Sequence, residues 1–210
     1  MGGWPAPARN GSLCLAEFTG ERVIPGQVDP ALWHEHVARY AFAARLARRK
    51  RVLDAGCGAG YGAAELSRVA SLVVGVDVAE EAIRHSAGHY PIDNLRYAQA
   101  SCAQLPFAGG AFDLVVALEV IEHLDDWRAF LHEARRVLAP GGQCVISTPN
   151  KDYYTASRGP SGANPYHRHE FTYQEFCHEL GAVFPHVSLF LQNRAEGFVF
   201  QPVRIFTPAE

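Results

Sequence analysis

The chain has 210 residues, of which 48% are hydrophobic and 20% are charged, and its formal net charge is -3. This length supports one substantial core and is short for two full domains. The lack of a basic excess argues against nucleic acid as a partner. The five cysteines are scattered and form no C-x-x-C pair, so they indicate neither a zinc site nor a disulfide framework.

The beginning of the chain predicts an arm followed by a helix. Residues 1–28 are rich in glycine and proline and show no periodic pattern, so we expect an irregular arm or lid, in which Glu21 and Arg22 close over a site. Asp29 and Pro30 are typical of a helix N-cap and first helical position. No apolar stretch is long enough for a signal peptide core or a membrane span, which favours a cytoplasmic protein without a membrane partner.

From residue 51 to residue 150 short apolar runs alternate with helical patterns. Strands this apolar, separated by helices, are typical of a parallel sheet covered on both faces. We therefore predict an α/β fold with a Rossmann-like, doubly wound sheet and helices on both faces. The expected strands are 51–56, 72–77, 95–100, 112–120 and 143–150, and the expected helices are 61–70, 79–90 and 125–139.

The alternation stops after residue 150. Residues 151–171 form a polar loop with several aromatic residues, and a loop of that length is more often functional than idle. Thr172 and Glu175 then have the spacing of a capping box that opens a helix. Strand-like runs follow at 186–192 and 198–206, and Pro202 favours an edge position. We expect one domain over 29–210, mostly parallel, with one antiparallel strand near the C-terminus.

The stretch "VLDAGCGAGYG" places four glycines at alternate positions behind the first strand. Glycine there allows a positive φ angle and a close approach of the backbone to a ligand. The helix that follows presents free N–H groups to an anionic group. The pattern indicates a nucleotide-type pocket. "GAGYGA" also fits the dinucleotide fingerprint, and Asp77 closes the second strand where an acid binds a ribose, so the glycines leave the cofactor open.

Four segments together resemble the class I S-adenosylmethionine-dependent methyltransferases. "VLDAGCGAGYG" is similar to their first motif, and "GVDVAEEAI" to their second-strand acid with its helix. "LPFAGGAFDLVVALEVIEHL" and "RVLAPGGQCVISTPN" are similar to their fourth-strand and fifth-strand regions. "TGERVIPG", "EHVARYAFA" and "NPYHRHEFTYQEF" look like a bacterial subgroup often associated with glycan and glycosyltransferase functions.

The resemblance implies S-adenosylmethionine as cofactor, with S-adenosylhomocysteine as product. It places Gly56 and Gly58 at the methionyl part, Asp54 at its amino group directly or through water, and Asp77 at the ribose hydroxyls. The family's usual aspartate near the adenine is replaced here by Ser101 and Cys102. The predicted cofactor-binding residues are Tyr40, Asp54, Gly56, Cys57, Gly58, Tyr61, Asp77, Val78, Ser101, Cys102, Leu118 and Glu119.

The acceptor site is expected between the early helix, the end of the fourth strand and the long loop. Methyl transfer to a hydroxyl benefits from a general base, and histidine is suited near neutral pH. His167 is our first candidate and His123 the second. His36, Tyr166 and His169 are predicted to contact the substrate.

The segment from Glu119 to His123 is similar to E-x-x-E-H segments that have been linked to a divalent metal in quinone-type O-methyltransferases. Only oxygen ligands and one histidine are in view there, so we interpret these acids as flanking the helix that opens near Asp125 and predict no metal.

The predicted function is methyl transfer to a hydroxyl of a sugar or another small metabolite, by a monomer or homodimer. N-methylation of a small metabolite is the first alternative. A NAD-binding oxidoreductase and a non-catalytic S-adenosylmethionine-binding protein are the others.

Overall fold

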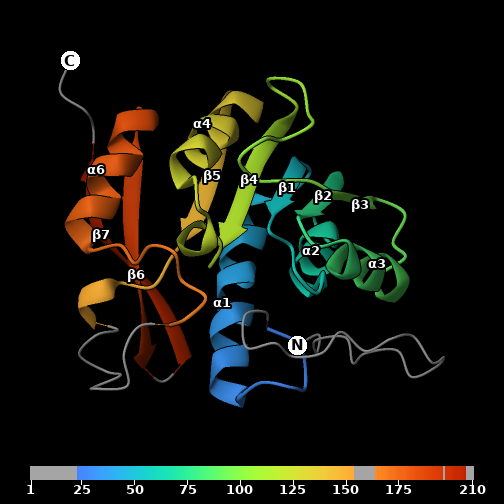
Figure 1. Cartoon of the computed structure of the whole chain (residues 1–210), viewed down its shortest axis with the longest axis horizontal. Coiled ribbons are helices and arrows are strands. Elements are labelled where there is room, and N and C mark those ends of the chain that lie inside the picture. The colour runs from blue at the N-terminus through green and yellow to red at the C-terminus, as the bar shows by residue number, and fades with distance from the viewer. Residues whose placement is uncertain (1–22, 154–163, 196, 207–210) are drawn as a thin grey trace.

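The computed structural model describes residues 23–153, 164–195 and 197–206 (Figure 1). Most of the predicted arm, with Glu21 and Arg22, and part of the predicted loop lie outside these ranges. Helix α1 (Pro30–Leu46) begins as predicted, because a carboxylate oxygen of Asp29 accepts a hydrogen bond from the N–H of Ala31 at 2.8 Å and proline occupies the first helical position.

Five parallel strands form the central sheet. They are β1 (Arg51–Ala55), β2 (Leu72–Asp77), β3 (Leu95–Gln99), β4 (Phe112–Leu118) and β5 (Leu138–Ser147), in the spatial order β3-β2-β1-β4-β5. The chain builds outward from β1 to β3 and then returns to the other side of β1 with β4. The predicted α/β doubly wound class is confirmed.

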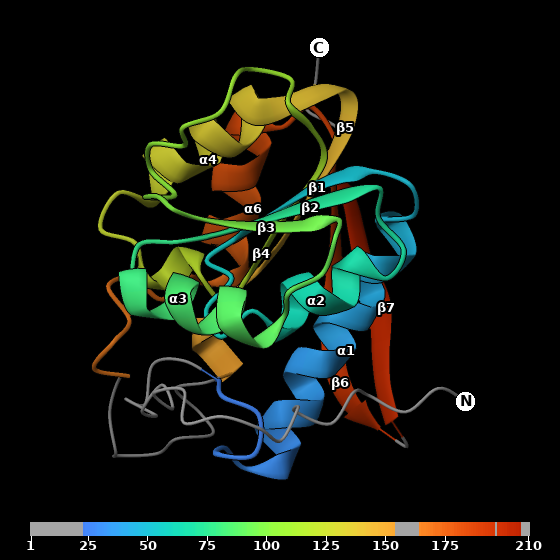
Figure 2. The ribbon, with the colours of Figure 1, turned by 90° about the vertical axis from the view of Figure 1, so that its right-hand side faces the viewer.

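Helices cover both faces of the sheet (Figure 2). On one face lie α1, α2 (Tyr61–Ser67) and α3 (Glu80–His89), and on the other lie α4 (Trp127–Val137) and α6 (Tyr173–Val183). Each face has its own core, one with Leu66 and Leu114 and the other with Phe130 and Leu131, all at most 1% exposed. A short 3₁₀ helix, η1 (Ile121–His123), follows β4.

The boundary between α4 and β5 differs from the prediction. The helix ends at Val137 rather than at residue 139, and strand pairing starts at Leu138, which lies opposite Phe112. Pro140, Gly141 and Gly142 therefore lie within the strand, where the register shifts, and not in a turn before it. Pairing with β4 on both sides of this irregularity extends the strand beyond its apolar run.

The antiparallel element near the C-terminus is a hairpin with its own sheet. Strands β6 (Val187–Ala195) and β7 (Gly197–Phe206) pair with each other, so the described part of the central sheet is entirely parallel. Pro202 lies opposite Phe190 at a register shift. Both strands of this two-stranded sheet are edge strands, which is where proline is tolerated because it cannot donate a backbone hydrogen bond.

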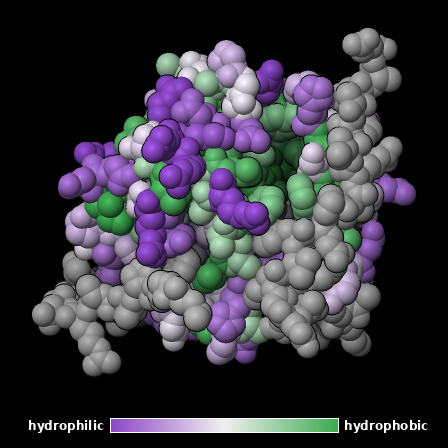
Figure 3. All heavy atoms as spheres, turned by 180° about the vertical axis from the view of Figure 1, so that it is seen from behind, coloured by the Kyte–Doolittle hydropathy of each residue, from purple (hydrophilic) through white to green (hydrophobic). Residues whose placement is uncertain are grey.

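Seen from behind, hydrophobic side chains gather in a hollow of the surface beside a region of hydrophilic ones (Figure 3). Among the described helices, none has both the length and the apolar character that crossing a membrane requires.

Candidate active site

A cavity of about 570 Å³ opens at the carboxyl ends of β1, β2 and β4. The strand order reverses between β1 and β4, and ligands of open α/β sheets bind at such a reversal. The volume of this cavity is within the range of small-molecule binding sites. Its walls include Val23, Leu32, His36, Tyr40, Gly56, Cys57, Gly58, Ala59, Tyr61, Asp77, Val78, Ser101, Cys102, Ala103, Leu118, Glu119, Val120, Glu122, His123, Leu124, Asp125, Asp126, Pro149, Asn164 and His167.

The glycine loop after β1 forms one wall of the cavity. The N–H groups of Gly56 and Cys57 donate to the carbonyl of Val76 at 2.8 and 2.9 Å, which ties the loop to β2. Gly58 has φ +52°, and a Cβ atom added to it would meet no protein atom within 4 Å. The backbone at Gly58 therefore faces open space, which leaves room for a ligand directly against it.

Asp77 lies at the end of β2 beside this loop. One carboxylate oxygen accepts from the N–H of Gly58 at 3.0 Å and the other from the N–H of Ala79 at 2.9 Å. Each oxygen has a second lone pair, so the carboxylate still accepts bonds from a ribose diol. Val78, the next residue, is 69% exposed although it is apolar and lines the cavity. A ligand with an apolar face, such as an adenosine, would cover it.

Asp54 lies beneath the loop rather than on the cavity wall. It is fully buried and accepts a hydrogen bond from the hydroxyl of Tyr40 at 3.2 Å. Burial raises the pKa of Asp54 to about 7, the Tyr40 hydrogen bond opposes that rise, and the charge of Asp77 adds to it. A positive ligand above the loop would favour the ionised carboxylate.

Helix α1 is held against the loop by aromatic side chains. The ring of Tyr40 passes so close to Gly62 that a Cβ atom there would lie 1.9 Å from it. The hydroxyl of Tyr61 and Nδ1 of His36 are hydrogen bonded at 3.2 Å. Burial, with help from Arg39, lowers the pKa of His36 to about 4 against an opposing effect of Glu119, so His36 is neutral at pH 7.

The far side of the predicted cofactor region contains two thiols. Cys57 and Cys102 are 3% and 6% exposed, and burial raises the pKa of both, to about 12 for Cys102. Protonated thiols offer small, weakly polar walls rather than nucleophiles. Ser101 and Leu118 also line this cavity.

Glu119 directly follows β4 and has a strained backbone conformation, with φ +56°. Its carboxylate accepts a hydrogen bond from the hydroxyl of Ser147 at 2.7 Å and lies 3.7 Å from the guanidinium of Arg39. Non-glycine residues with positive φ are uncommon and concentrate at functional sites. The strain directs the chain into η1, which brings the next residues to the cavity.

Two histidines from distant segments meet at the cavity. His123 ends η1 and His167 lies in the segment predicted as the polar loop, and their rings make an edge contact with centroids 5.0 Å apart. Glu122 lies beside them, 1% exposed, and burial raises the pKa of its carboxyl well above the usual range. The fold therefore brings together the two residues predicted to act as bases.

Two predicted substrate contacts are placed elsewhere. His169 is hydrogen bonded to Glu175 at 2.7 Å and packs against Trp127 and Phe171, away from the cavity. Tyr166 is 39% exposed and does not line the cavity, but its carbonyl accepts a hydrogen bond from Nδ1 of His123. Of the three residues predicted to contact substrate, only His36 is on the cavity wall.

Several wall residues were not predicted from the sequence. Asn164 and Pro149 reach the cavity through the loop after β5, and Val23 through the segment before α1. These residue types carry no distinctive pattern. Glu122 did have a signal, its spacing from Glu119 and its neighbour His123, but the sequence did not indicate that it would be buried.

The comparisons with known proteins agree with this geometry. A family model described as "Methyltransferase domain" matches residues 53–146. A probable S-adenosylmethionine-dependent methyltransferase of Mycolicibacterium smegmatis is 39% identical over 164 residues, covering 78% of this chain and 63% of the relative. A ubiquinone biosynthesis O-methyltransferase of Azorhizobium caulinodans is 32% identical over 181 residues, covering 80% of this chain and 70% of the relative.

A solved structure shares the fold. The N-methyltransferase NodS of Bradyrhizobium japonicum, in complex with S-adenosylhomocysteine, superimposes with a TM-score of 0.63 at 18% identity, covering 85% of this chain and 90% of that one. The chain spans less than two thirds of the Mycolicibacterium relative's length.

The glycine loop, the carboxylate of Asp77 at the end of β2 and the open space above Gly58 fit S-adenosylmethionine, which the name of the Mycolicibacterium relative includes. The chain belongs to the class I S-adenosylmethionine-dependent methyltransferases.

Proposed function

We propose that this chain transfers a methyl group from S-adenosylmethionine to a hydroxyl of a small-molecule acceptor, a sugar or another metabolite. The observation that carries the proposal is the single cavity that joins Gly58 and Asp77 to the histidine pair. Such continuity is required because the nucleophile must approach the methyl group in line with the sulfur.

The cofactor end supports binding and orientation. Asp77 would accept the ribose hydroxyls, the glycine loop would lie along the methionyl part, and Val78 would cover one face of the adenosine. Asp54 is buried beneath the loop, so it would stabilise the positive charges of the ligand without touching the ligand. Bound there, S-adenosylmethionine supplies a methyl group activated by a sulfonium.

The acceptor end supports removal of a proton. Nδ1 of His123 donates to the carbonyl of Tyr166 at 3.0 Å, so the other ring nitrogen of the neutral imidazole is an acceptor. Nδ1 of His167 lies 3.0 Å from a carboxylate oxygen of Glu170 in the same way. His167 remains our first candidate for the group that faces the hydroxyl, and His123 the second.

An oxygen acceptor is also favoured by the Azorhizobium relative, which is named for O-methyl transfer. The predicted arm and loop, about 1–28 and 151–171, would supply the rest of the acceptor's surroundings within one domain.

The test is mass spectrometry of a metabolite and nucleotide-sugar library incubated with the chain and methyl-labelled cofactor. We expect one labelled methyl group on a hydroxyl-bearing compound. The proposal fails if the chain binds S-adenosylhomocysteine but labels no acceptor. A thermal shift with NAD and none with S-adenosylhomocysteine would favour an oxidoreductase instead.

A further inference from the structure

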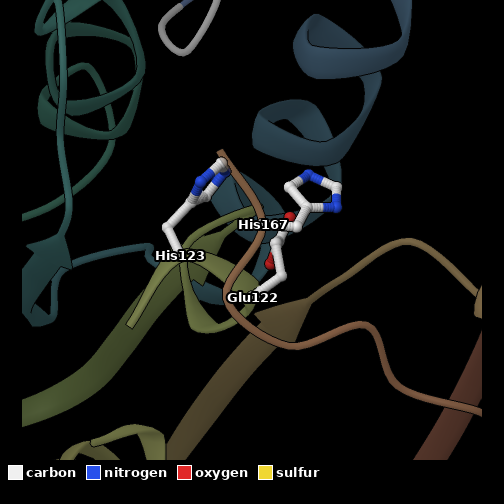
Figure 4. Close-up of side chains that lie close together, drawn as sticks. All are labelled: Glu122, His123 and His167. Carbon is white, nitrogen blue, oxygen red and sulfur yellow. The ribbon is translucent and has the colours of Figure 1, made fainter. Parts of the chain in front are cut away.

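Three side chains at the acceptor end of the cavity have the composition of a metal site. One ligand atom from each of Glu122, His123 and His167 lies within 4.8 Å of the other two. Figure 4 shows the two imidazoles extending in the same direction, with the Glu122 carboxylate next to them. The sequence placed only one histidine near these acids, and the fold adds the second.

Backbone hydrogen bonds fix this arrangement. The carbonyl of Glu122 accepts from the N–H of Arg168 at 2.8 Å and from the N–H of His169 at 3.1 Å. His167 is therefore held beside η1 by its own neighbours in the chain. Its side chain is 5% exposed, which restricts it to few orientations.

The hydrogen bonds of both imidazoles select the same tautomer. The carbonyl of Tyr166 can only accept, so Nδ1 of His123 carries the proton, and Glu170 has the same effect on Nδ1 of His167. Nε2 of each ring is then an acceptor. Histidines that bind metals almost always donate their other N–H to a carbonyl or a carboxylate. In the present structure Nε2 of His167 lies 3.1 Å from the side-chain nitrogen of Asn164.

The carboxylate of Glu122 is incompletely satisfied. Oε2 accepts from the hydroxyl of Thr148 at 3.0 Å, while Oε1 is buried and has no hydrogen-bond partner within the part of the chain that the structure describes. An unpaired carboxylate oxygen in a buried position is costly, and a cation would remove that cost.

We propose that Glu122, His123 and His167 bind one divalent transition-metal ion of the Zn²⁺ class. Bonds of about 2.0–2.2 Å require ligands about 3–4 Å apart, so small side-chain rotations close the present cluster around an ion. Two imidazoles and one carboxylate favour Zn²⁺, Mn²⁺, Fe²⁺ or Co²⁺ over Mg²⁺ and Ca²⁺, which prefer oxygen ligands. Three protein ligands leave positions open for a further ligand.

The charges around the cluster also favour a cation. Asp125, Asp126 and Glu119 line the same cavity. The carboxylate of Asp125 lies 3.4 Å from the guanidinium of Arg168, and that of Glu119 lies 3.7 Å from the guanidinium of Arg39. The wall therefore carries at least four acidic side chains, and a divalent ion would stabilise their ionised forms.

The role of the ion rests on the proposed function. The acceptor hydroxyl would occupy an open position, and coordination would lower its pKa so that its proton leaves to solvent. The oxygen would then form a bond to the methyl carbon as the bond from that carbon to sulfur breaks. The products are a methyl ether, S-adenosylhomocysteine and one proton. The ion would thus perform the task otherwise assigned to the imidazoles.

Binding can be tested without any acceptor. The full chain, stripped by a chelator and dialysed, is titrated with Co²⁺ alone, and bound ions are followed by visible absorption and elemental analysis. We expect one ion per chain. His123→Ala and His167→Ala should each weaken binding more than tenfold, and Glu170→Gln about tenfold, because outer partners contribute about that much.

A matched control is His132→Ala, since His132 is an exposed histidine on α4 and outside the cavity. It should bind Co²⁺ as the unchanged chain does. Glu122→Gln keeps the size of the side chain and the bond to Thr148, so it tests the carboxylate if an alanine variant fails to fold. Absence of binding by the unchanged chain overturns the site, and so does binding by His123→Ala and His167→Ala that is as tight as that of the unchanged chain.

The activity experiment separates this proposal from the function itself. Methyl transfer that stops on chelation and returns with Zn²⁺ or Co²⁺ supports the role of the ion. Methyl transfer that persists without metal overturns that role and leaves the proposed function intact. A chain that methylates no acceptor with or without metal fails the proposed function, while Co²⁺ binding still judges the site.

Discussion

The two ends of the cavity are built in different ways. At the cofactor end, backbone groups of one short loop meet the carboxylate of Asp77 at the ends of the adjacent strands β1 and β2. At the acceptor end, side chains from η1 meet His167, which lies in the long loop after β5. The first arrangement depends on local sequence, and the second depends on how distant segments pack. Substitutions at the two ends should therefore have different effects on cofactor binding and on stability.

The largest effect is expected from Asp77→Ala. This change removes the acceptor for a ribose diol and also the two backbone bonds that hold Gly58 and Ala79. Hydrogen bonds to charged groups contribute about 1.5–3 kcal/mol each, so S-adenosylhomocysteine should bind about 100-fold more weakly. Isothermal titration measures this. Asp93→Ala, at an exposed aspartate, is the control, and unchanged binding by Asp77→Ala would contradict the cofactor site.

A substitution at Gly62 should act through packing rather than through ligand contacts. In Gly62→Ala the new Cβ atom would lie 1.9 Å from the ring of Tyr40, so α1 must shift. Overpacking of this kind costs about 1–3 kcal/mol, and thermal unfolding should show a lower Tm with weaker cofactor binding.

The same change at Gly88 provides a matched control. Gly88 is exposed in α3, where alanine favours the helix by about 1 kcal/mol, so Gly88→Ala should raise the Tm. Equal effects of the two variants would show that the contact between Tyr40 and Gly62 is unimportant.

Cofactor binding should depend on pH through Asp54. Its pKa of about 7 is raised by burial above the unfolded value of 3.8, so its contribution to the free energy of unfolding is largest below about pH 4 and is lost as the pH rises through about 7. A cationic ligand favours the ionised form, so affinity should fall as the pH drops below about 7. Isothermal titration with S-adenosylmethionine at several pH values measures the midpoint of this change in affinity.

Tyr40→Phe sharpens this test, because the Tyr40 hydroxyl opposes the rise in the pKa of Asp54. Without the hydroxyl the midpoint should move to higher pH, while Tyr153→Phe, at a side chain that is 72% exposed, should leave it unchanged. A midpoint that is the same in all three proteins would exclude Asp54 as the responsible group.

The sequence predicted the two ends to different extents. The apolar runs and the helical periods between them were enough to predict the parallel sheet, because each run and the glycine loop after the first strand are local patterns. The positions of Gly58 and Asp77 followed from the same patterns. The position of His169 outside the cavity could not be predicted, because it depends on packing against Trp127 and on a hydrogen bond with Glu175. The burial of Glu122 and its proximity to His167 depend on backbone bonds between segments that the sequence does not connect.

The smallest effect is expected where the acceptor segment joins the scaffold. The hydroxyl of Thr172 accepts from the N–H of Glu175 at 3.2 Å and caps α6, so the Thr side of the predicted capping box is present. Thr172→Ala should cost about 1 kcal/mol and lower the Tm by about 2–4 °C. S-adenosylhomocysteine should bind it as before, because the cofactor end does not use α6. Thr172→Ser, which keeps the hydroxyl, should retain the Tm. If Thr172→Ala weakens cofactor binding as much as stability, the two ends of the cavity are coupled through the fold, and the prediction that they are independent is wrong.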